Sequence, residues 1–221
     1  MTLHDDDLIE QLDRARGWRR VVIAADLGFS EGESGPARLR QLLGEAGRGT
    51  SDLRAAALLA LAKRCGEEAH DDFVAAFHSA DAGTRSYAVL ALAAYGRDGL
   101  WDEVSDRLAK TLKQRVRDDG TPSNTTLMIT YLARHATRQP GRTSALVNLL
   151  RTHWARLDPI DSDGDKVVDL EGATNTEWVQ TYWPDVSPDG PAAEDVPPPN
   201  IAAIEAWVRS LPVLSRTKLP D

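Results

Sequence analysis

Apolar and polar residues alternate along residues 18–157 with the period of amphipathic helices separated by short breaks. Residues 54–62, RAAALLALA, align with residues 85–93, RSYAVLALA, at an offset of 31. Each block ends near a glycine, Gly66 or Gly96, which is where helices commonly stop. The pattern therefore predicts two Ala- and Leu-rich helices that occupy equivalent places in a repeat.

A second amphipathic stretch follows each block. Phe73 and Phe77 lie four residues apart on one face of residues 67–80, and residues 99–113 carry apolar residues on one face at every turn. Each block and its follower predict a helix hairpin of about thirty residues, the size of a unit in a helical solenoid.

Weaker copies flank these two hairpins. Residues 123–136 and 141–157 predict another hairpin, and residues 18–28 and 36–47 predict a degenerate first one, preceded by a capping helix over residues 4–15. One hairpin cannot bury its own apolar face, so the hairpins must stack.

Two local features support the repeat. Ser51 and Asp52 offer an N-cap to the first block. Ala57 and its equivalent Ala88 are small enough to allow close approach between helices of stacked units.

The pattern Arg-x-x-Ala-x-x-Ala-Leu-Ala in residues 54–62 and 85–93 resembles the HEAT or HEAT-like class of helical repeats. The resemblance covers residues 51–114 well and residues 18–157 loosely. It implies a curved stack whose second helices line a concave surface that grips a protein or a nucleic acid, and it carries no fixed catalytic set. We therefore expect an all-α fold, a HEAT-like α-α superhelix of about four helix hairpins over residues 1–157.

The helical pattern changes after Leu157. Residues 158–221 form an acidic, Pro-rich extension, in which residues 167–183 carry several aliphatic and aromatic side chains. Residues 200–211 show the spacing of a terminal amphipathic helix. We expect both apolar stretches to dock on the solenoid.

The net charge of −8 is distributed unevenly. Residues 110–157 hold nine Lys or Arg against Asp118 and Asp119, a net of +7, whereas residues 158–195 hold eleven acids against Lys166, a net of −10. The predicted macromolecule-binding residues come from the basic segment: Lys110, Lys113, Arg117, Arg134, Arg138 and Arg151. They fit a groove for phosphates, a solvated face, or a docking surface for the chain's own acidic extension. The last is favoured over nucleic acid because a tethered partner has a high effective concentration.

Residues 159–172, PIDSDGDKVVDLEG, place acids at alternate positions in the manner of a calcium loop. A register that puts Asp161, Asp163 and Asp165 at positions 1, 3 and 5 has Lys166 in the glycine slot and no glutamate at position 12. The alternative register places Pro159 at position 1. The stretch is therefore interpreted as an Asp/Gly turn, with Ca²⁺ at the three aspartates as the alternative.

Catalytic patterns are weak. Glu67 and His70 form one Glu-x-x-His pair without a second copy, and Cys65 lies near a predicted helix C-terminus, where the dipole raises the pKa of a thiol. The resemblance leaves one enzyme alternative, a HEAT-like DNA glycosylase, a family that handles damaged bases with concave aromatic and acidic residues. The residues that fit it here are Trp101, Asp102 and Trp154. We predict no catalytic activity, no bound metal and no cofactor.

No stretch approaches 18 continuous apolar residues, and the first twelve residues are acidic where a signal peptide is basic. With a single cysteine, these features favour a cytoplasmic protein that does not enter a membrane. The function expected is a protein-protein interaction adaptor or regulatory subunit that uses the concave face. The alternative is a nucleic-acid-binding or DNA-repair protein that uses the basic helices.

Overall fold

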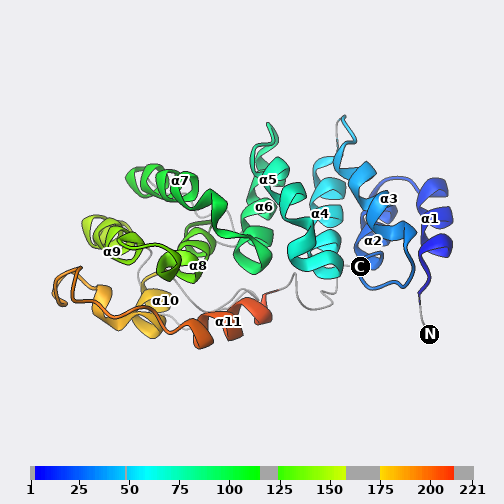
Figure 1. Ribbon diagram of the computed structural model, residues 1–221. Coiled ribbons are helices and arrows are strands. Elements are labelled where there is room, and N and C mark those ends of the chain that lie inside the picture. The colour runs from blue at the N-terminus through cyan, green and yellow to red at the C-terminus, as the bar shows by residue number, and fades with distance from the viewer. Residues whose placement is uncertain (1–2, 48, 115–123, 158–174, 212–221) are drawn as a thin grey trace. The chain divides into compact units, whose positions relative to one another are not determined.

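The computed structural model describes residues 3–47, 49–114, 124–157 and 175–211, and most of these residues are helical. No strand occurs in these ranges, although His4 and Glu31 form an isolated bridge. The α-helices, shown in Figure 1, are α1 (Asp5–Arg14), α2 (Trp18–Asp26), α3 (Ser34–Leu43), α4 (Ser51–Cys65), α5 (His70–Phe77), α6 (Ala82–Tyr95), α7 (Trp101–Lys113), α8 (Asn124–His135), α9 (Arg142–Thr152), α10 (Asn175–Tyr182) and α11 (Ile201–Ser210). Short 3₁₀ turns are η1 (Gly66–Ala69), η2 (Asp98–Leu100), η3 (Ala136–Arg138), η4 (Trp154–Arg156) and η5 (Pro184–Val186). The all-helical fold class predicted from the sequence is confirmed.

The two repeated blocks became α4 and α6, which end at Gly66 and Gly96 as predicted. The predicted N-cap of α4 is wrong. Ser51 is already the first helical residue, and its hydroxyl donates to the carboxylate of Asp81 over 2.9 Å instead of accepting from its own helix.

The described residues separate into two compact units, one that ends at Gly96 and one that covers Arg97–Leu211. Each is described by itself below. The boundary predicted at 157/158, between a solenoid and its extension, is a different division and stays a prediction.

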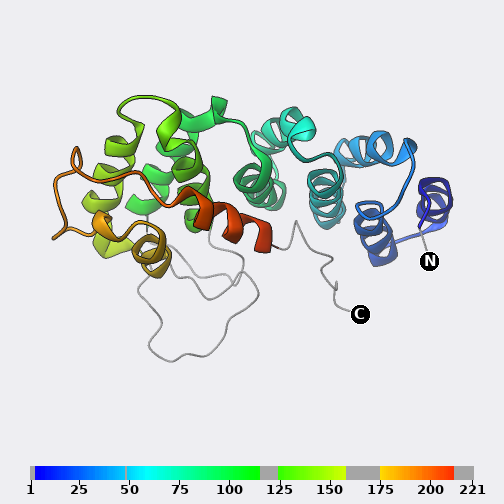
Figure 2. The same ribbon diagram turned by 60° about the horizontal axis from the view of Figure 1, so that its bottom comes forward.

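The first unit has two layers of helices. α2, α4 and α6 pack side by side, with α3 against α4 and α5 against α6 in the second layer, and α1 contacting both α2 and α3 (Figures 1 and 2). The tight hairpins are therefore α3–α4 and α5–α6, because α4 makes few contacts with α5. The sequence paired α4 with α5, so the predicted hairpin register is wrong by one helix. Amphipathic spacing shows that a face must be buried but does not say which neighbour buries it.

Small residues let the helices of the inner layer approach closely. Ala57 on α4 and Ala88 on α6 are fully buried. At the end of α2, a Cβ added to Gly28 would lie 3.0 Å from the Cα of Ala60 on α4. A larger residue would force the neighbouring backbone to shift, so the close approach of α4 favours glycine at this position.

A buried ion pair fastens the N-terminal segment to the first unit. Arg64, near the end of α4, donates from Nη1 to Oδ1 of Asp5 over 2.6 Å and from Nη2 to Oδ2 over 2.9 Å. The Ser30 hydroxyl and the Gly35 amide also donate to the Asp5 carboxylate, over 2.6 and 2.7 Å. Burial raises the pKa of Asp5, but the hydrogen bonds from Arg64, Ser30 and Gly35 outweigh burial and lower the pKa to about 2.

The second unit is organised around α8, which is buried along almost its whole length. α7 and α8 form an antiparallel hairpin, because the Trp101 indole at the start of α7 donates to the carbonyl of Leu132 near the end of α8, over 3.1 Å. Tyr131 joins the same ends: its hydroxyl accepts from the Leu100 amide and donates to the carbonyl of Arg97.

The described part of the Pro-rich extension packs on α8. α10 and α11 both contact this helix, and Figure 2 shows α11 lying across it. Trp178 and Trp183 are almost completely buried, so the apolar residues of the extension contribute to the core of the second unit. The Trp183 indole donates to the carbonyl of Pro197 over 2.9 Å, which closes the loop between α10 and α11.

Candidate functional site

The basic residues predicted to bind a macromolecule lie on several elements of the second unit. Lys110 and Lys113 are exposed on α7, Arg138 is exposed in η3, and Arg134 is half-buried on α8. Arg117 lies outside the described residues.

The antiparallel hairpin keeps these cations apart. Lys110 and Lys113 lie at the C-terminal end of α7. Arg134 lies near the C-terminal end of α8, and Arg138 lies in η3, which follows directly; this end of α8 meets the beginning of α7. A helix of this length spans roughly 20 Å, so the two pairs do not share one local patch.

Arg151 on α9 has a structural role. Its guanidinium donates to the carbonyls of Asp185, Val186 and Ser187 over 3.0 to 3.2 Å. The partners are backbone groups of the extension rather than its acidic side chains. Arg151 therefore fastens this loop of the extension to α9. The macromolecule-binding role of the basic residues stays a prediction.

In the described residues, the fold does not assemble the other predicted chemical sites. Asp161, Asp163 and Asp165 lie outside the described residues. Burial raises the pKa of Cys65, which disfavours the thiolate. Trp101 is buried, with the Arg142 guanidinium 5.0 Å from its ring centroid, so it packs in the core of the second unit.

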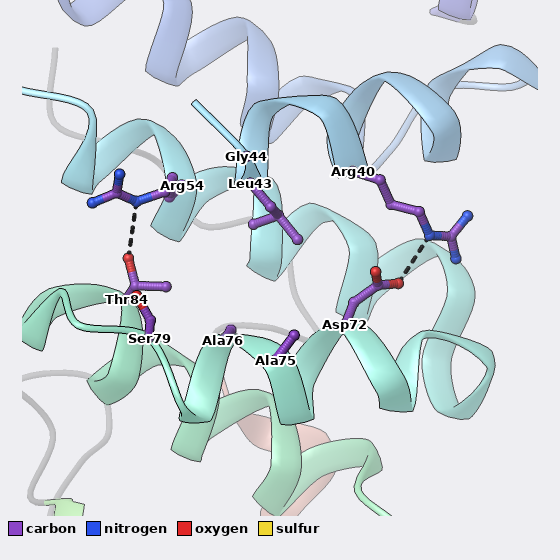
Figure 3. A pocket seen from close by; sticks show the side chains of 9 residues that line it. All are labelled: Arg40, Leu43, Gly44, Arg54, Asp72, Ala75, Ala76, Ser79 and Thr84. Atoms are coloured by element: carbon purple, nitrogen blue, oxygen red, sulfur yellow. Dashed lines mark hydrogen bonds and ion pairs between the residues drawn. The ribbon is translucent and has the colours of Figure 1, made fainter. Parts of the chain in front are cut away.

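The candidate functional site is a groove in the first unit between α3 and α5, with a volume of about 330 Å³. In Figure 3, Arg40 and Asp72 lie at one end of the groove, Arg54 and Thr84 lie at the other, and apolar side chains lie between them. The lining residues are Arg40, Leu43, Gly44, Arg54, Asp72, Ala75, Ala76, Ser79 and Thr84.

Successive hairpins create this groove. Leu43 comes from the end of α3, and Ala75 and Ala76 lie on α5, where two alanines leave space between the helices. Leu43 is half-buried and Ala75 is exposed, so the middle of the groove presents apolar surface to solvent.

The Arg54 end is a closed polar network. The guanidinium donates to the Glu45 carbonyl over 2.8 Å and to the Thr84 hydroxyl over 3.2 Å, and it lies 3.4 Å from the Asp81 carboxylate. Asp81 caps α6 by accepting from the amide and hydroxyl of Thr84, each over 2.7 Å. Hydrogen bonds from Thr84 and Ser51 lower the pKa of Asp81 to about 2. This end of the groove is held in place by the junction of two hairpins.

The Arg40 end is more open. Arg40 Nε lies 2.9 Å from Asp72 Oδ2, and the two side chains are 45% and 24% exposed. The hydrogen bond from Arg40 to Asp72 raises the pKa of Arg40, against the opposing effect of burial. An exposed pair of this kind contributes little to stability, and its charges remain accessible to a ligand.

The repeat explains part of this site. Arg54 and Arg85, the first residues of the aligned blocks, both donate to carbonyls of the loop before their own helix: Arg54 to Glu45, and Arg85 to Ser79 and Ala80. The sequence alignment found these arginines but not Arg40, Leu43 or Asp72. Those residues come from neighbouring hairpins, and their proximity depends on a packing register that the sequence mispredicted.

A second hollow of about 400 Å³ is lined by the end of α1, the start of α2 and Arg38 in the middle of α3. Of its three arginines, Arg20 makes two hydrogen bonds to Glu45 over 2.6 and 2.9 Å, and Arg38 donates to Asp13 over 2.6 Å. These two arginines connect elements of the fold, and we assign no ligand to the hollow.

Comparisons with protein-family models, with curated proteins and with solved structures found no match to this chain. Among the described helices, none combines the length and apolar character needed to cross a bilayer.

Proposed function

We propose that the protein is a non-catalytic interaction module, an adaptor or regulatory subunit, that binds a segment of another protein in the groove between α3 and α5. The single observation that carries this proposal is the groove itself: an apolar floor between two successive hairpins, with an accessible ion pair at one end. We also propose that the repeat is HEAT-like, so that the groove is a surface between stacked units.

Two features support the HEAT-like assignment. α3–α4 and α5–α6 pack as consecutive hairpins with their second helices side by side. Arg54 and Arg85, at equivalent places in the aligned blocks, both anchor the preceding loop by hydrogen bonds to its carbonyls. Equivalent residues with equivalent contacts are expected of a structural repeat.

The chemistry of the groove favours a protein over a nucleic acid or a substrate. The Thr84 hydroxyl and the Arg54 guanidinium at one end are bonded within the fold. At the other end, Arg40 is paired with Asp72, and the neighbouring exposed acids Glu68 and Asp71 oppose a phosphate. What remains is an apolar surface with charged edges, which is the composition of a protein-binding patch.

The test is affinity capture from an extract of the source organism, with and without nuclease treatment, comparing the full chain with an Ala75→Trp variant. Ala75 is exposed and lines the groove, so an indole at this position fills the space without entering the core. The matched control is Ala206→Trp, which places the same side chain at an exposed helical position of α11.

The proposal predicts a co-purifying protein that survives nuclease treatment, is retained by Ala206→Trp and is depleted at least about tenfold by Ala75→Trp. A partner captured equally by both variants would show that the groove is not the interaction site. Capture that disappears with nuclease would favour nucleic-acid binding through the basic residues of the second unit.

A further inference from the structure

We infer that the groove between α3 and α5 selects a partner segment that carries an aliphatic side chain with a lysine or arginine two to four residues away. The inference rests on the proposed function, because it names the chemistry of the segment bound at the same site. It follows from three properties of the groove, namely its apolar middle, its closed polar end and its acidic edge.

The middle of the groove fits an aliphatic side chain. Leu43 stands opposite Ala75 and Ala76 in Figure 3, and none of these side chains offers a hydrogen bond. The volume of about 330 Å³ is at the lower limit of small-molecule pockets, which favours the anchoring of individual side chains over the enclosure of a cofactor.

The closed polar end limits the shape of the groove but does not select the charge of the bound segment. Arg54 is directed to Thr84 and Asp81, and its side chain is only 16% exposed. Its charge is compensated inside the network, so a partner carboxylate would have to break bonds that hold two hairpins together. Selection by charge must therefore come from the opposite end.

The opposite end carries excess negative charge. Asp72 accepts the hydrogen bond from Arg40 Nε at one carboxylate oxygen, Oδ2, and the dashed line in Figure 3 reaches this oxygen alone. Glu68 is exposed in η1, and Asp71 is exposed in the first turn of α5 beside Asp72. The hydrogen bond to Asp72 is the main cause that raises the pKa of Arg40, and the charge of Glu68 adds a smaller contribution in the same direction. Three acids against one arginine leave a local net charge of −2, which complements a basic residue.

The spacing of the motif follows from α5. Asp72 and Ala76 are one helical turn apart, so the cation site and the apolar floor are separated by about 6 Å. Side chains with that separation are two residues apart on one face of an extended segment, or three to four apart on a helix.

The test uses random peptides displayed on phage and selected on the full 221-residue chain, with the Ala75→Trp variant for counter-selection. Selected sequences are then synthesised as matched pairs in which the basic residue is retained or replaced by glutamate. Affinities are measured by fluorescence anisotropy at low and near-physiological salt, against the wild-type chain and an Asp72→Lys variant.

The inference predicts enrichment of the aliphatic-basic spacing and a loss of at least about tenfold in affinity when the basic residue becomes glutamate. It also predicts that the Asp72→Lys variant binds the glutamate peptide more tightly than the basic one, because Arg40 then lies beside a second cation. A misfolded variant would lose binding to both peptides, so reversal is a signature that destabilisation cannot produce.

Three results would each overturn the inference. The first is selection of acidic or uncharged sequences, and the second is an unchanged peptide preference in Asp72→Lys. The third is the absence of any peptide that binds the wild-type chain but not the Ala75→Trp variant. These results are distinguishable from failure of the proposed function. If capture from extract depends on the groove while the selected peptides are acidic, the function stands and the motif is wrong.

Discussion

Two arginine-aspartate pairs in the first unit have the same chemistry and opposite settings. Arg64 and Asp5 are 12% and 2% exposed and share their bonds with Ser30, Gly35 and backbone carbonyls. Arg40 and Asp72 are 45% and 24% exposed and meet through a single guanidinium nitrogen. Removing one member of a buried pair leaves an uncompensated charge, whereas an exposed pair is screened by water and contributes little. The comparison separates a pair that holds the N-terminal segment from a pair that is available to a partner.

The largest effect is expected at the buried pair. Asp5→Ala leaves the Arg64 guanidinium buried without its carboxylate and should destabilise the first unit by about 3–5 kcal/mol. Amide hydrogen exchange with mass spectrometry over residues 3–35 reads this out locally. Glu10→Ala, which breaks an exposed pair with Arg14, is the matched control and should change stability by less than about 0.5 kcal/mol. Equal effects in the two variants would remove the distinction between buried and exposed pairs.

Acid should weaken the ion pair between Arg64 and Asp5. The pKa of Asp5 is about 2 in the folded protein and about 3.9 in an unfolded chain, so its contribution is present above pH 4 and is lost as the pH falls toward 2. The linked change is about 2–3 kcal/mol. Exchange protection of residues 3–35, measured between pH 5 and pH 2.5 after correction for intrinsic exchange rates, should decline more in the wild type than in Asp5→Asn. Parallel pH profiles would contradict this assignment.

Gly35→Ala tests the packing around the ion pair between Arg64 and Asp5. A Cβ at this position would lie 2.8 Å from Asp5 Oδ1 and would also meet the Arg64 guanidinium, so the pair must shift. We expect a loss of about 1–3 kcal/mol, typical of overpacking, measured by the urea dependence of amide hydrogen exchange over residues 3–35. The control is Gly44→Ala, where the nearest atom beyond the chain neighbours lies 3.4 Å away. An unchanged free energy of unfolding in Gly35→Ala would show that the ion pair between Arg64 and Asp5 tolerates displacement.

Asp81→Ala removes the N-cap of α6 and the carboxylate near Arg54. An N-cap contributes about 1 kcal/mol, so the expected loss is of that size and should be seen as faster amide exchange in α6. Asp81→Asn keeps an acceptor for the Thr84 amide and should recover part of the loss. Failure of asparagine to restore protection would indicate that charge, rather than capping, is the main contribution.

The smallest effect on stability is expected at the groove. Asp72→Ala should change the free energy of unfolding by no more than about 1 kcal/mol, because both partners are partly exposed. Urea unfolding checks this value, and peptide binding by the same variant should fall much more than its stability. A strongly destabilised Asp72→Ala protein would place this pair with Arg64 and Asp5 as a structural element.

Local sequence patterns predicted the helices better than their partners. Phe73 and Phe77 marked the buried face of α5, and both are almost completely buried. The spacing could not show that α4 packs on α3 more than on α5, because either neighbour can cover an apolar stripe. The groove depends on that choice, since it brings Leu43 of one hairpin to Ala75 of the next.

Charge patterning was a less direct guide than packing. The +7 segment contains cations that face different ends of the α7–α8 hairpin, and Arg151 bonds backbone carbonyls that no pattern of charged residues reveals. The groove residues Arg40 and Asp72 lie thirty-two positions apart and have no motif in common. A contact of this kind is set by tertiary packing, so it became visible only with the fold.

The most direct test of the central claim is ¹³C-methyl NMR of the full chain, labelled at alanine and leucine, titrated with a peptide that contains one leucine and a lysine two residues away. We expect the largest saturable shifts at the methyl groups of Leu43, Ala75 and Ala76, and we expect Ala75→Trp to abolish them. Saturable shifts confined to methyl groups of residues 97–211, or no saturable shifts, would contradict a protein-binding groove of this specificity in the first unit.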